Sequence, residues 1–563
     1  MNANTNTTPP TAGHAQSGPD AKPGKKPRDL RLDFFRGLAM FIILLAHTPG
    51  NAWTLWIPAR FGFSDATEIF VFCSGMASAM AFGAVFAKKS WFLGAARIAF
   101  RVWQVYWAHI GVVLATALMM VALDKVGFGE PGRAYADTWF PLAGLFSRTH
   151  ETLLGLFTLT YIPGLFDILP MYLVILALVP VVMTLHRLGG KEAVFAFVLL
   201  TWLAANLAGY ARHSADATDL TMLGEAFRSA GQLFLWMNLP GIPWIEGATW
   251  FFNPFGWQLV FFTGFSFAMG WLPAPPVNRV LVGLAIGVVL ITIPLAWHKM
   301  FQWMTGYVPQ HWGGEFFWDA REDIAPLRWK SWVGAWRFVH FLAIAYLAWA
   351  AVGVDGNRLR TGWSMVERSG ARRLFIRVVT GIILIVTAPY AYLNEIAFAA
   401  PWLDQWIIDN YLLLPARYIG IALLVHLTAL IMFVWHSIGD EWRRWLLADA
   451  FLATVPVIRK VGTQSLAVFL VSIVLSRFSG RWMDHMDAWL IAHDVAYFEP
   501  RDAWMLLLVN GTGIGILIAT AYLVGWFKSE PWRGDAKGHQ AKHRKQDVKL
   551  SQEAPVAATR SAV

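Results

Sequence analysis

Cysteine is almost missing from this 563-residue chain, which contains only Cys73. A single cysteine excludes a disulfide within the chain and any metal site built from cysteine thiolates. Charged residues are also scarce, at 15% of the sequence, whereas hydrophobic residues make up 56%. This balance is far from that of a soluble domain, and it predicts an all-α, polytopic integral membrane protein.

Apolar runs of a length that crosses a bilayer recur along the chain. They predict about 10 to 12 transmembrane helices in one domain at 28–527, between disordered cytoplasmic tails at 1–27 and 528–563. The runs lie at Phe34–Pro49, Ile69–Phe86, Val102–Leu123, Leu169–Leu185, Ala193–Gly209, Gly256–Leu272, Val280–Trp297, Phe338–Val354, Val378–Leu393, Tyr418–Trp435, Val461–Ser476 and Ala503–Phe527.

Basic residues are divided unevenly between the two sides that these spans define. Roughly two-thirds of the 46 Lys and Arg residues fall in the tails and loops on the side of the termini. The positive-inside rule therefore places both termini in the cytoplasm. The net charge of +10 follows from this topology and gives no reason to expect a nucleic-acid partner.

Three ionisable residues lie in the first predicted span, where such groups are costly in lipid and indicate function. Asp33 and Arg36 are three residues apart, and His47 follows Arg36 by eleven residues, which is about three helical turns. The three side chains therefore share one face of the helix. Because an imidazole can take a proton from a hydroxyl near neutral pH, His47 is the candidate catalytic base. The structural alternative is a histidine hydrogen-bonded to a neighbouring helix.

Further polar residues begin the second and third spans. Asp65 and Glu68 lie on the side that His47 approaches, where a carboxylate could orient the imidazole. A helix N-terminus also favours acidic residues, so capping is the structural alternative for both. Arg97 and Arg101 lie at the cytoplasmic boundary, where they could bind phosphate or carboxylate groups. Alternatively, their long side chains could place the guanidinium groups at the membrane–water interface.

Two smaller features complete the set of candidates. The small residues Ser74 and Gly75 in the second span would permit a close contact between helices or access for a thin substrate. Polar residues at or just inside other span ends are candidates for substrate binding: Asp167, Tyr172, Asn253, Gln258 and Ser465.

Four motifs in the first half of the chain are typical of a known family. They are Arg31-Leu-Asp33-Phe-Phe-Arg36-Gly37, His47-x-Pro49-Gly50-Asn51, Phe61-Gly-Phe63-Ser64-Asp65-Ala-x-Glu68 and Phe166-Asp167-Ile-Leu-Pro170-Met-Tyr172. Together they resemble the OpgC branch of the membrane acyltransferases that include O-antigen acetylases. Arg97 with Arg101, and Gly462-x-x-Ser465, resemble weaker motifs of the wider family.

The resemblance implies an O-acyltransferase of the bacterial inner membrane. It would move an acyl group, succinyl or acetyl, from cytoplasmic acyl-CoA to hydroxyls of an osmoregulated periplasmic glucan. Arg36, Arg97 and Arg101 would bind the CoA phosphates, and His47 would act as base or as the carrier of a transient acyl group. Asp33 would belong to the substrate site. No metal or tightly bound cofactor is implied, and glucan-synthesis proteins are candidate partners.

Two other classes of function remain open from the sequence alone. A secondary transporter could use His47, Asp65 and Glu68 as a proton relay, although no internal repeat is visible. A polyprenyl-phosphate-dependent glycosyltransferase would need a metal or lipid-phosphate site in the first outer loop. That loop, at 50–63, contains no acidic residue.

Overall fold

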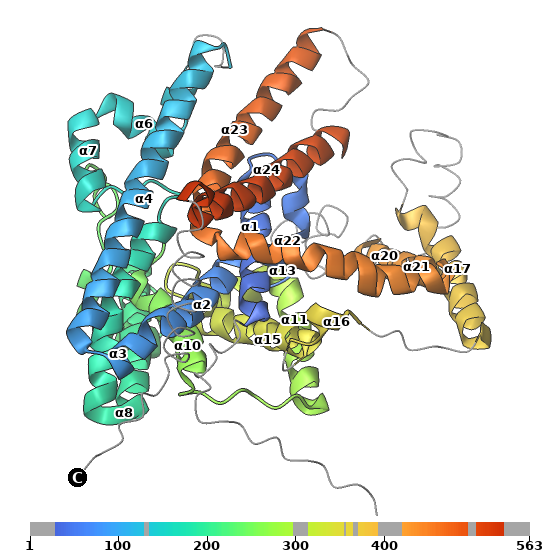
Figure 1. The fold of residues 1–563 in the computed structure, drawn as a ribbon, viewed down its shortest axis with the longest axis horizontal. Helices are drawn as coiled ribbons and strands as arrows, with labels where there is room; N and C mark the ends of the chain where they lie inside the picture. The colour runs from blue at the N-terminus through green and yellow to red at the C-terminus, as the bar shows by residue number, and fades with distance from the viewer. Residues whose placement is uncertain are drawn as a thin grey trace, which may run out of the picture.

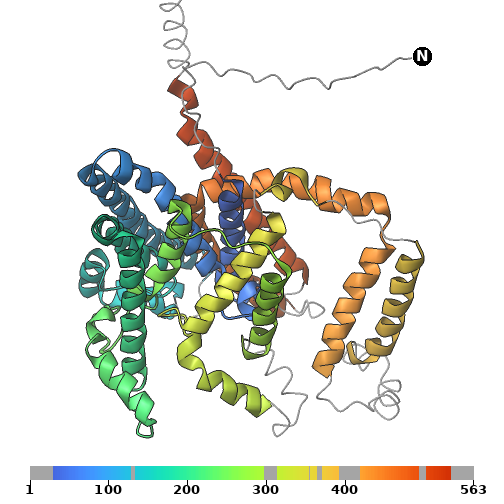
Figure 2. The same cartoon turned by 90° about the horizontal axis from the view of Figure 1, so that it is seen from below.

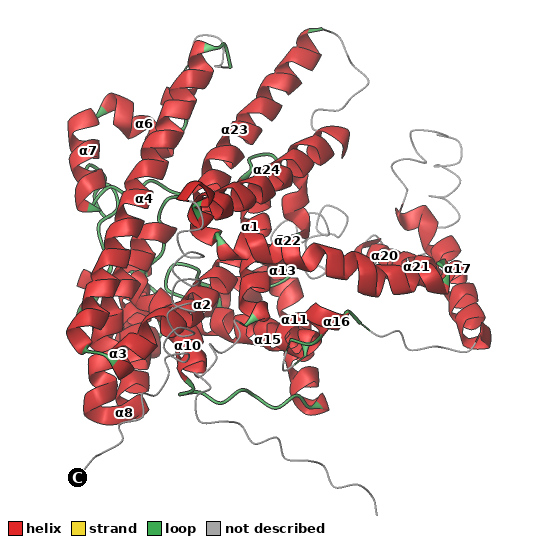
Figure 3. Cartoon of the chain, viewed as in Figure 1, coloured by secondary structure: helices red, strands yellow, loops and turns green. Residues whose placement is uncertain are grey.

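The structure, a computed structural model, describes residues 29–128, 134–296, 314–353, 356–363, 370–391, 419–493 and 503–533. Within these ranges the chain is helical, and a single bridge between Pro240 and Thr249 is the sole β-type pairing (Figure 1 and Figure 3). The all-α prediction is therefore confirmed. The predicted tail at 1–27 and residues 534–563 of the second tail lie outside the described residues.

Six of the described helical segments are long and apolar enough to cross a bilayer. The first is Ala66–Phe86, which runs through α2 (Ala66–Ser78) and η3 (Ala79–Gly83) into α3 (Ala84–Lys88). The other five are α4 (Trp91–Lys125), α8 (Ile168–His213), α15 (Ala335–Val352), α23 (Ser465–Ala492) and α24 (Ala503–Ser529). These segments support a polytopic membrane protein. The larger number of spans expected from the sequence stays a prediction.

The structure describes further helices outside these six segments. Those of more than ten residues are α1 (Leu30–His47), α9 (Met222–Gln232), α10 (Pro254–Met269), α11 (Arg279–Ala296), α17 (Gly370–Ala391), α20 (Ile419–Ser437) and α22 (Phe451–Thr463). The shorter ones are α5 (Tyr135–Thr138), α6 (Phe140–Ser147), α7 (Thr149–Thr158), α13 (Gly314–Asp323), α14 (Ala325–Arg328), α16 (Arg358–Thr361) and α21 (Asp440–Arg444).

The long α8 is interrupted at two adjacent glycines. Gly189 and Gly190 leave helical geometry, and Gly190 has a φ of 66°, which glycine adopts without steric cost. The interruption separates two helical segments. They correspond to the runs Leu169–Leu185 and Ala193–Gly209 that the sequence predicts as separate spans.

Helix α1 occupies the centre of the bundle. It contacts α2, α22 and α23, while α10 packs between α2 and α8, and α4 packs against α8 and α23 (Figure 1). The side chains between these helices form one buried apolar core that includes Met40, Phe70, Val113 and Phe261. Helices α17 and α20 pair with each other at one edge of the molecule (Figure 2).

The contact between α2 and α10 depends on two glycines. A Cβ atom added to Gly75 would lie 1.9 Å from the carbonyl oxygen of Phe261, and one added to Gly264 would lie 2.2 Å from that of Phe72. No side chain fits at either position. The close helix contact predicted at Gly75 is therefore confirmed, and it holds α2 against the core.

We expect Gly75→Ala to lower the free energy of unfolding by about 1 to 3 kcal/mol, because the added methyl group forces α2 away from α10. The matched control is Gly111→Ala in α4, where a Cβ would meet nothing within 4 Å. Thermal unfolding of both purified variants in detergent tests the expectation. Equal midpoints for the two variants would contradict it.

Candidate functional site

Helix α1 carries the three ionisable residues of the first predicted span into the interior. Asp33 is completely buried, Arg36 is 8% exposed, and His47 is half-buried as the last residue of the helix. Arg36 donates a hydrogen bond of 2.7 Å to the carbonyl oxygen of Cys73 in α2. The polar face predicted from the sequence therefore lies inside the bundle.

The start of α2 is capped by both of its candidate carboxylates. The backbone N–H of Thr67 donates to Asp65 over 2.6 Å, and the backbone N–H of Asp65 donates to Glu68 over 2.8 Å. This reciprocal arrangement is a capping box. The capping role given as the structural alternative is thus present, and it holds both carboxylates in place.

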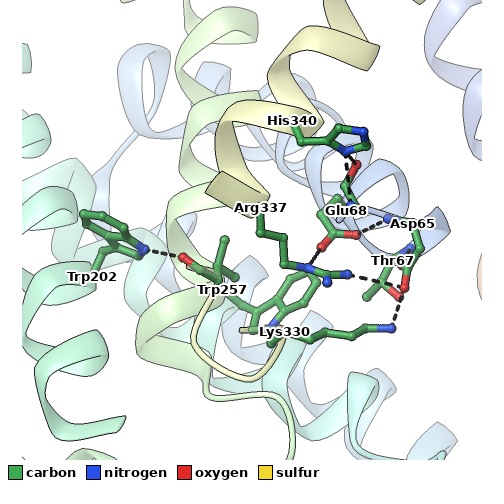
Figure 4. A network of polar contacts seen from close by, with 10 residues as sticks. Asp65, Thr67, Glu68, Trp202, Trp257, Lys330, Arg337 and His340 are labelled. Atoms are coloured by element: carbon green, nitrogen blue, oxygen red, sulfur yellow. Dashed lines mark hydrogen bonds and ion pairs between the residues drawn. The ribbon is translucent and has the colours of Figure 1, made fainter. Parts of the chain in front are cut away.

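Two cations from a distant part of the chain complete this cluster. Lys330 donates to Asp65, and Arg337 at the start of α15 donates to Glu68 and, over 3.4 Å, to Asp65 (Figure 4). Burial favours the neutral form of Asp65, but the adjacent charges of Lys330 and Arg337 outweigh it and hold the pKa of Asp65 well below its usual range. Asp65 is therefore an anion at neutral pH. We call these four residues the ionic cluster.

A histidine joins the ionic cluster to the preceding loop. The backbone N–H of Ser64 donates to Nδ1 of His340 over 3.2 Å, and the Ser64 hydroxyl lies 2.8 Å from the same nitrogen (Figure 4). Because Nδ1 accepts a hydrogen bond from an N–H group, the proton of the neutral ring is on Nε2. His340 therefore fixes the loop that leads into α2.

His47 lies within electrostatic range of this cluster. The charges of Lys330, Asp65 and Arg477 all act on it, and Arg477 of α23 donates to its backbone carbonyl oxygen. Among the described residues, no hydrogen bond joins the His47 ring to Asp65 or Glu68. Both carboxylates instead bind backbone N–H groups and cations, so their orienting role toward His47 stays a prediction.

The third-span arginines line a cavity to which Arg36 does not contribute. Arg97, Arg101 and Gln104 line a surface cavity of about 360 Å³ on α4, and Arg36 is not part of its lining. Arg101 donates to Gln104 over 3.2 Å. Lys528 at the end of α24 lies within electrostatic range of Arg101 and adds positive charge here. The cavity can therefore receive an anionic group.

The other candidates serve mainly as links between helices. Asn253 caps α10 by accepting from the N–H groups of Phe255 and Gly256, at 2.9 and 3.2 Å. Gln258 donates to the carbonyl oxygen of Val198 over 2.7 Å, and the Tyr172 hydroxyl lies 3.5 Å from that of Ser78.

Two candidates lie at helix starts. Asp167 precedes α8, and burial raises its pKa to about 6. Ser465 is the half-buried first residue of α23. In the Gly462-x-x-Ser465 motif, a Cβ at Gly462 would lie 1.8 Å from the carbonyl oxygen of Asp33, so this glycine permits α22 to touch α1.

Sequence reasoning did not identify Lys330, Arg337 or Arg477. Arg337 directly precedes the predicted span Phe338–Val354, and Arg477 directly follows the predicted span Val461–Ser476. Each therefore has the position of an ordinary basic residue at the end of a transmembrane helix. The available signal was their place on the side predicted from the sequence to be non-cytoplasmic, where the positive-inside rule leaves few basic residues. Within the described residues, no group of three or more His, Cys, Asp or Glu side chains could hold a metal ion.

Comparison with known proteins identifies the family. A family model described as OpgC protein matches residues 28–395 and 364–529, which is most of the chain. No curated protein and no solved structure matches the chain. The match includes α1, the ionic cluster and α23. The chain therefore belongs to the OpgC family, which implies a membrane enzyme of the transferase type.

Proposed function

We propose that the protein is an O-acyltransferase of the bacterial inner membrane that moves a succinyl group from cytoplasmic succinyl-CoA to hydroxyls of a periplasmic glucan. The observation that supports this most strongly is the OpgC family match over most of the chain. A half-buried histidine at the end of the central helix, close to several fixed charges, suits acyl transfer chemically.

In the proposed reaction, His47 removes the proton from a glucan hydroxyl. The hydroxyl oxygen attacks the thioester carbonyl carbon, the new C–O ester bond forms, and the C–S bond to CoA breaks. The imidazolium then returns its proton to the departing CoA thiolate. The positive charges of Lys330 and Arg477, which act on His47, suit the negative charge that develops on the carbonyl oxygen.

The donor would enter from the cytoplasmic side. Its phosphates would contact Arg97 and Arg101 in the cavity on α4, whose charges and open position suit an anionic ligand. Attachment of succinate leaves one free carboxylate on each modified sugar, so the product glucan gains negative charge.

We expect Arg97→Ala and Arg101→Ala each to raise KM for succinyl-CoA by about 10-fold with little change in kcat, because each removes a charge-assisted contact to a non-reacting part of the donor. Arg279→Ala is the control, since Arg279 is exposed like Arg97 and lies at the start of α11. Steady-state release of CoA by the purified variants measures both constants. An unchanged KM in both variants would remove these arginines from the donor site.

The proposed function itself is tested by the ester-linked acyl groups on periplasmic glucans. A deletion strain complemented with the wild-type gene is expected to regain succinate esters that the deletion strain lacks. If no acyl ester differs between the strains, while membrane vesicles with the protein take up a solute, the transporter alternative replaces the acyltransferase.

A further inference from the structure

Arg477 is a buried cation beside the C-terminal end of α1. It lies in α23, its side chain is 8% exposed, and its guanidinium lies 5.1 Å from the centre of the Trp139 ring. Stacking on an aromatic face is common for guanidinium groups and leaves their edge free to form hydrogen bonds. Among the described residues, its hydrogen bond is the donation to the carbonyl oxygen of His47.

Within the described part of the chain, the charge of Arg477 is not balanced by an anion. Among the described side chains no carboxylate forms an ion pair with Arg477, and its Nε is buried without a hydrogen-bond acceptor. Two buried arginines differ in this respect, because Arg337 pairs with Glu68, and Arg481, one turn further along α23, lies 3.9 Å from Asp484. Arg36 of α1 resembles Arg477, since it donates to a backbone carbonyl oxygen and forms no ion pair with a described carboxylate. A buried, uncompensated charge is costly, and its retention indicates that a ligand supplies the missing anion.

The location of Arg477 defines which anion would fit. Its contact with the backbone of His47 places the guanidinium beside the candidate base, where the acyl group must lie during transfer. In a succinyl thioester two methylene groups separate the reacting carbonyl carbon from a free carboxylate. A side chain adjacent to His47 is therefore well placed to bind that carboxylate while the carbonyl group reacts.

We propose that Arg477 binds the free carboxylate of a dicarboxylic acyl donor and thereby selects succinyl-CoA over monocarboxylic acyl-CoA of equal length. This inference rests on the proposed function. The guanidinium fork matches the geometry of a carboxylate, which can accept two parallel hydrogen bonds. A purely structural role is the alternative, since arginine also stabilises the C-terminal end of a helix such as α1.

Selectivity separates the two roles. Transfer to an uncharged glucan is measured with succinyl-CoA and with butyryl-CoA, which has four acyl carbons and no carboxylate. The wild type is expected to favour succinyl-CoA in kcat/KM, and Arg477→Gln is expected to lower kcat/KM for succinyl-CoA by about 10- to 100-fold while changing the value for butyryl-CoA by less than about 3-fold. Arg481→Gln, the matched control on the same helix, is expected to keep the wild-type preference.

Binding provides a second measurement that requires no turnover. Two stable thioethers of CoA, one with a 3-carboxypropyl group and one with a butyl group, are compared by the thermal stabilisation that each gives to the full-length protein. The wild type should be stabilised more by the carboxylate-bearing compound, and Arg477→Lys, which retains the charge but loses the fork, should keep only part of the difference.

Several outcomes would overturn the inference. They are a wild type without preference between the two thioethers or the two donors, or an equal loss of activity with both donors in Arg477→Gln. Transfer is also repeated with a glucan that already carries anionic substituents, and a loss that occurs with that glucan alone is the third such outcome. The last would assign Arg477 to the acceptor. A wild type that binds the carboxylate thioether selectively but transfers neither acyl group would instead contradict the proposed function and leave the carboxylate site standing.

Discussion

Replacing His47 with alanine is expected to reduce glucan acylation by about 10²- to 10⁴-fold, the contribution typical of a general base. His47 is the last residue of α1, and its ring is half-buried near Lys330 and Arg477. Alanine leaves the helix intact and removes the group that would accept the hydroxyl proton. The loss should appear in kcat, because the imidazole acts on the reacting atoms and does not hold the donor.

The control for this variant is His436→Ala. His436 is also buried in a helix, where its Nδ1 lies 2.7 Å from the carbonyl oxygen of Met432, but α20 lies at the edge of the molecule (Figure 1). Both variants are compared at equal abundance in purified membranes, with succinate on the glucan as the readout. Wild-type acylation by the His47 variant would end the proposed mechanism.

The local features of this protein were predictable from its sequence. The apolar runs predicted the all-helical fold, and the small residue Gly75 predicted a close helix contact, which the structure shows between α2 and α10. Both predictions succeed because the length of an apolar run and the size of a side chain act locally. The Asp65-x-x-Glu68 spacing also matches a capping box, which the structure contains. In each case residues close in sequence determine the outcome.

The surroundings of His47 were not predictable in the same way. Lys330 is 265 residues from Asp65, and Arg477 is 430 residues from His47. Nothing in a local pattern indicates which distant basic residue will meet a given carboxylate, since that depends on how α15 and α23 pack against α2 and α1. The sequence offered capping or an orienting role toward His47 for Asp65 and Glu68, and it did not predict the cations that these carboxylates bind.

We expect Arg337→Met to lower the free energy of unfolding by about 3 to 5 kcal/mol, because it leaves the buried carboxylate of Glu68 without its cation. The Glu68 side chain is fully buried and that of Arg337 is 8% exposed, so solvent cannot replace the lost partner. The double variant Glu68→Leu with Arg337→Met removes both charges and should be considerably more stable than the single variant. Thermal unfolding in detergent measures all three proteins.

A surface pair supplies the control for this experiment. Arg148 lies 3.4 Å from Glu151, and both side chains are about half exposed, at 51% and 52%. Arg148→Met should therefore change the free energy of unfolding by less than about 1 kcal/mol, since water screens the charge that remains. If Arg337→Met is no more destabilising than Arg148→Met, the ionic cluster does not hold α15 against α2. If the double variant is as unstable as the single variant, the loss arises from packing around the Arg337 side chain and not from an uncompensated charge.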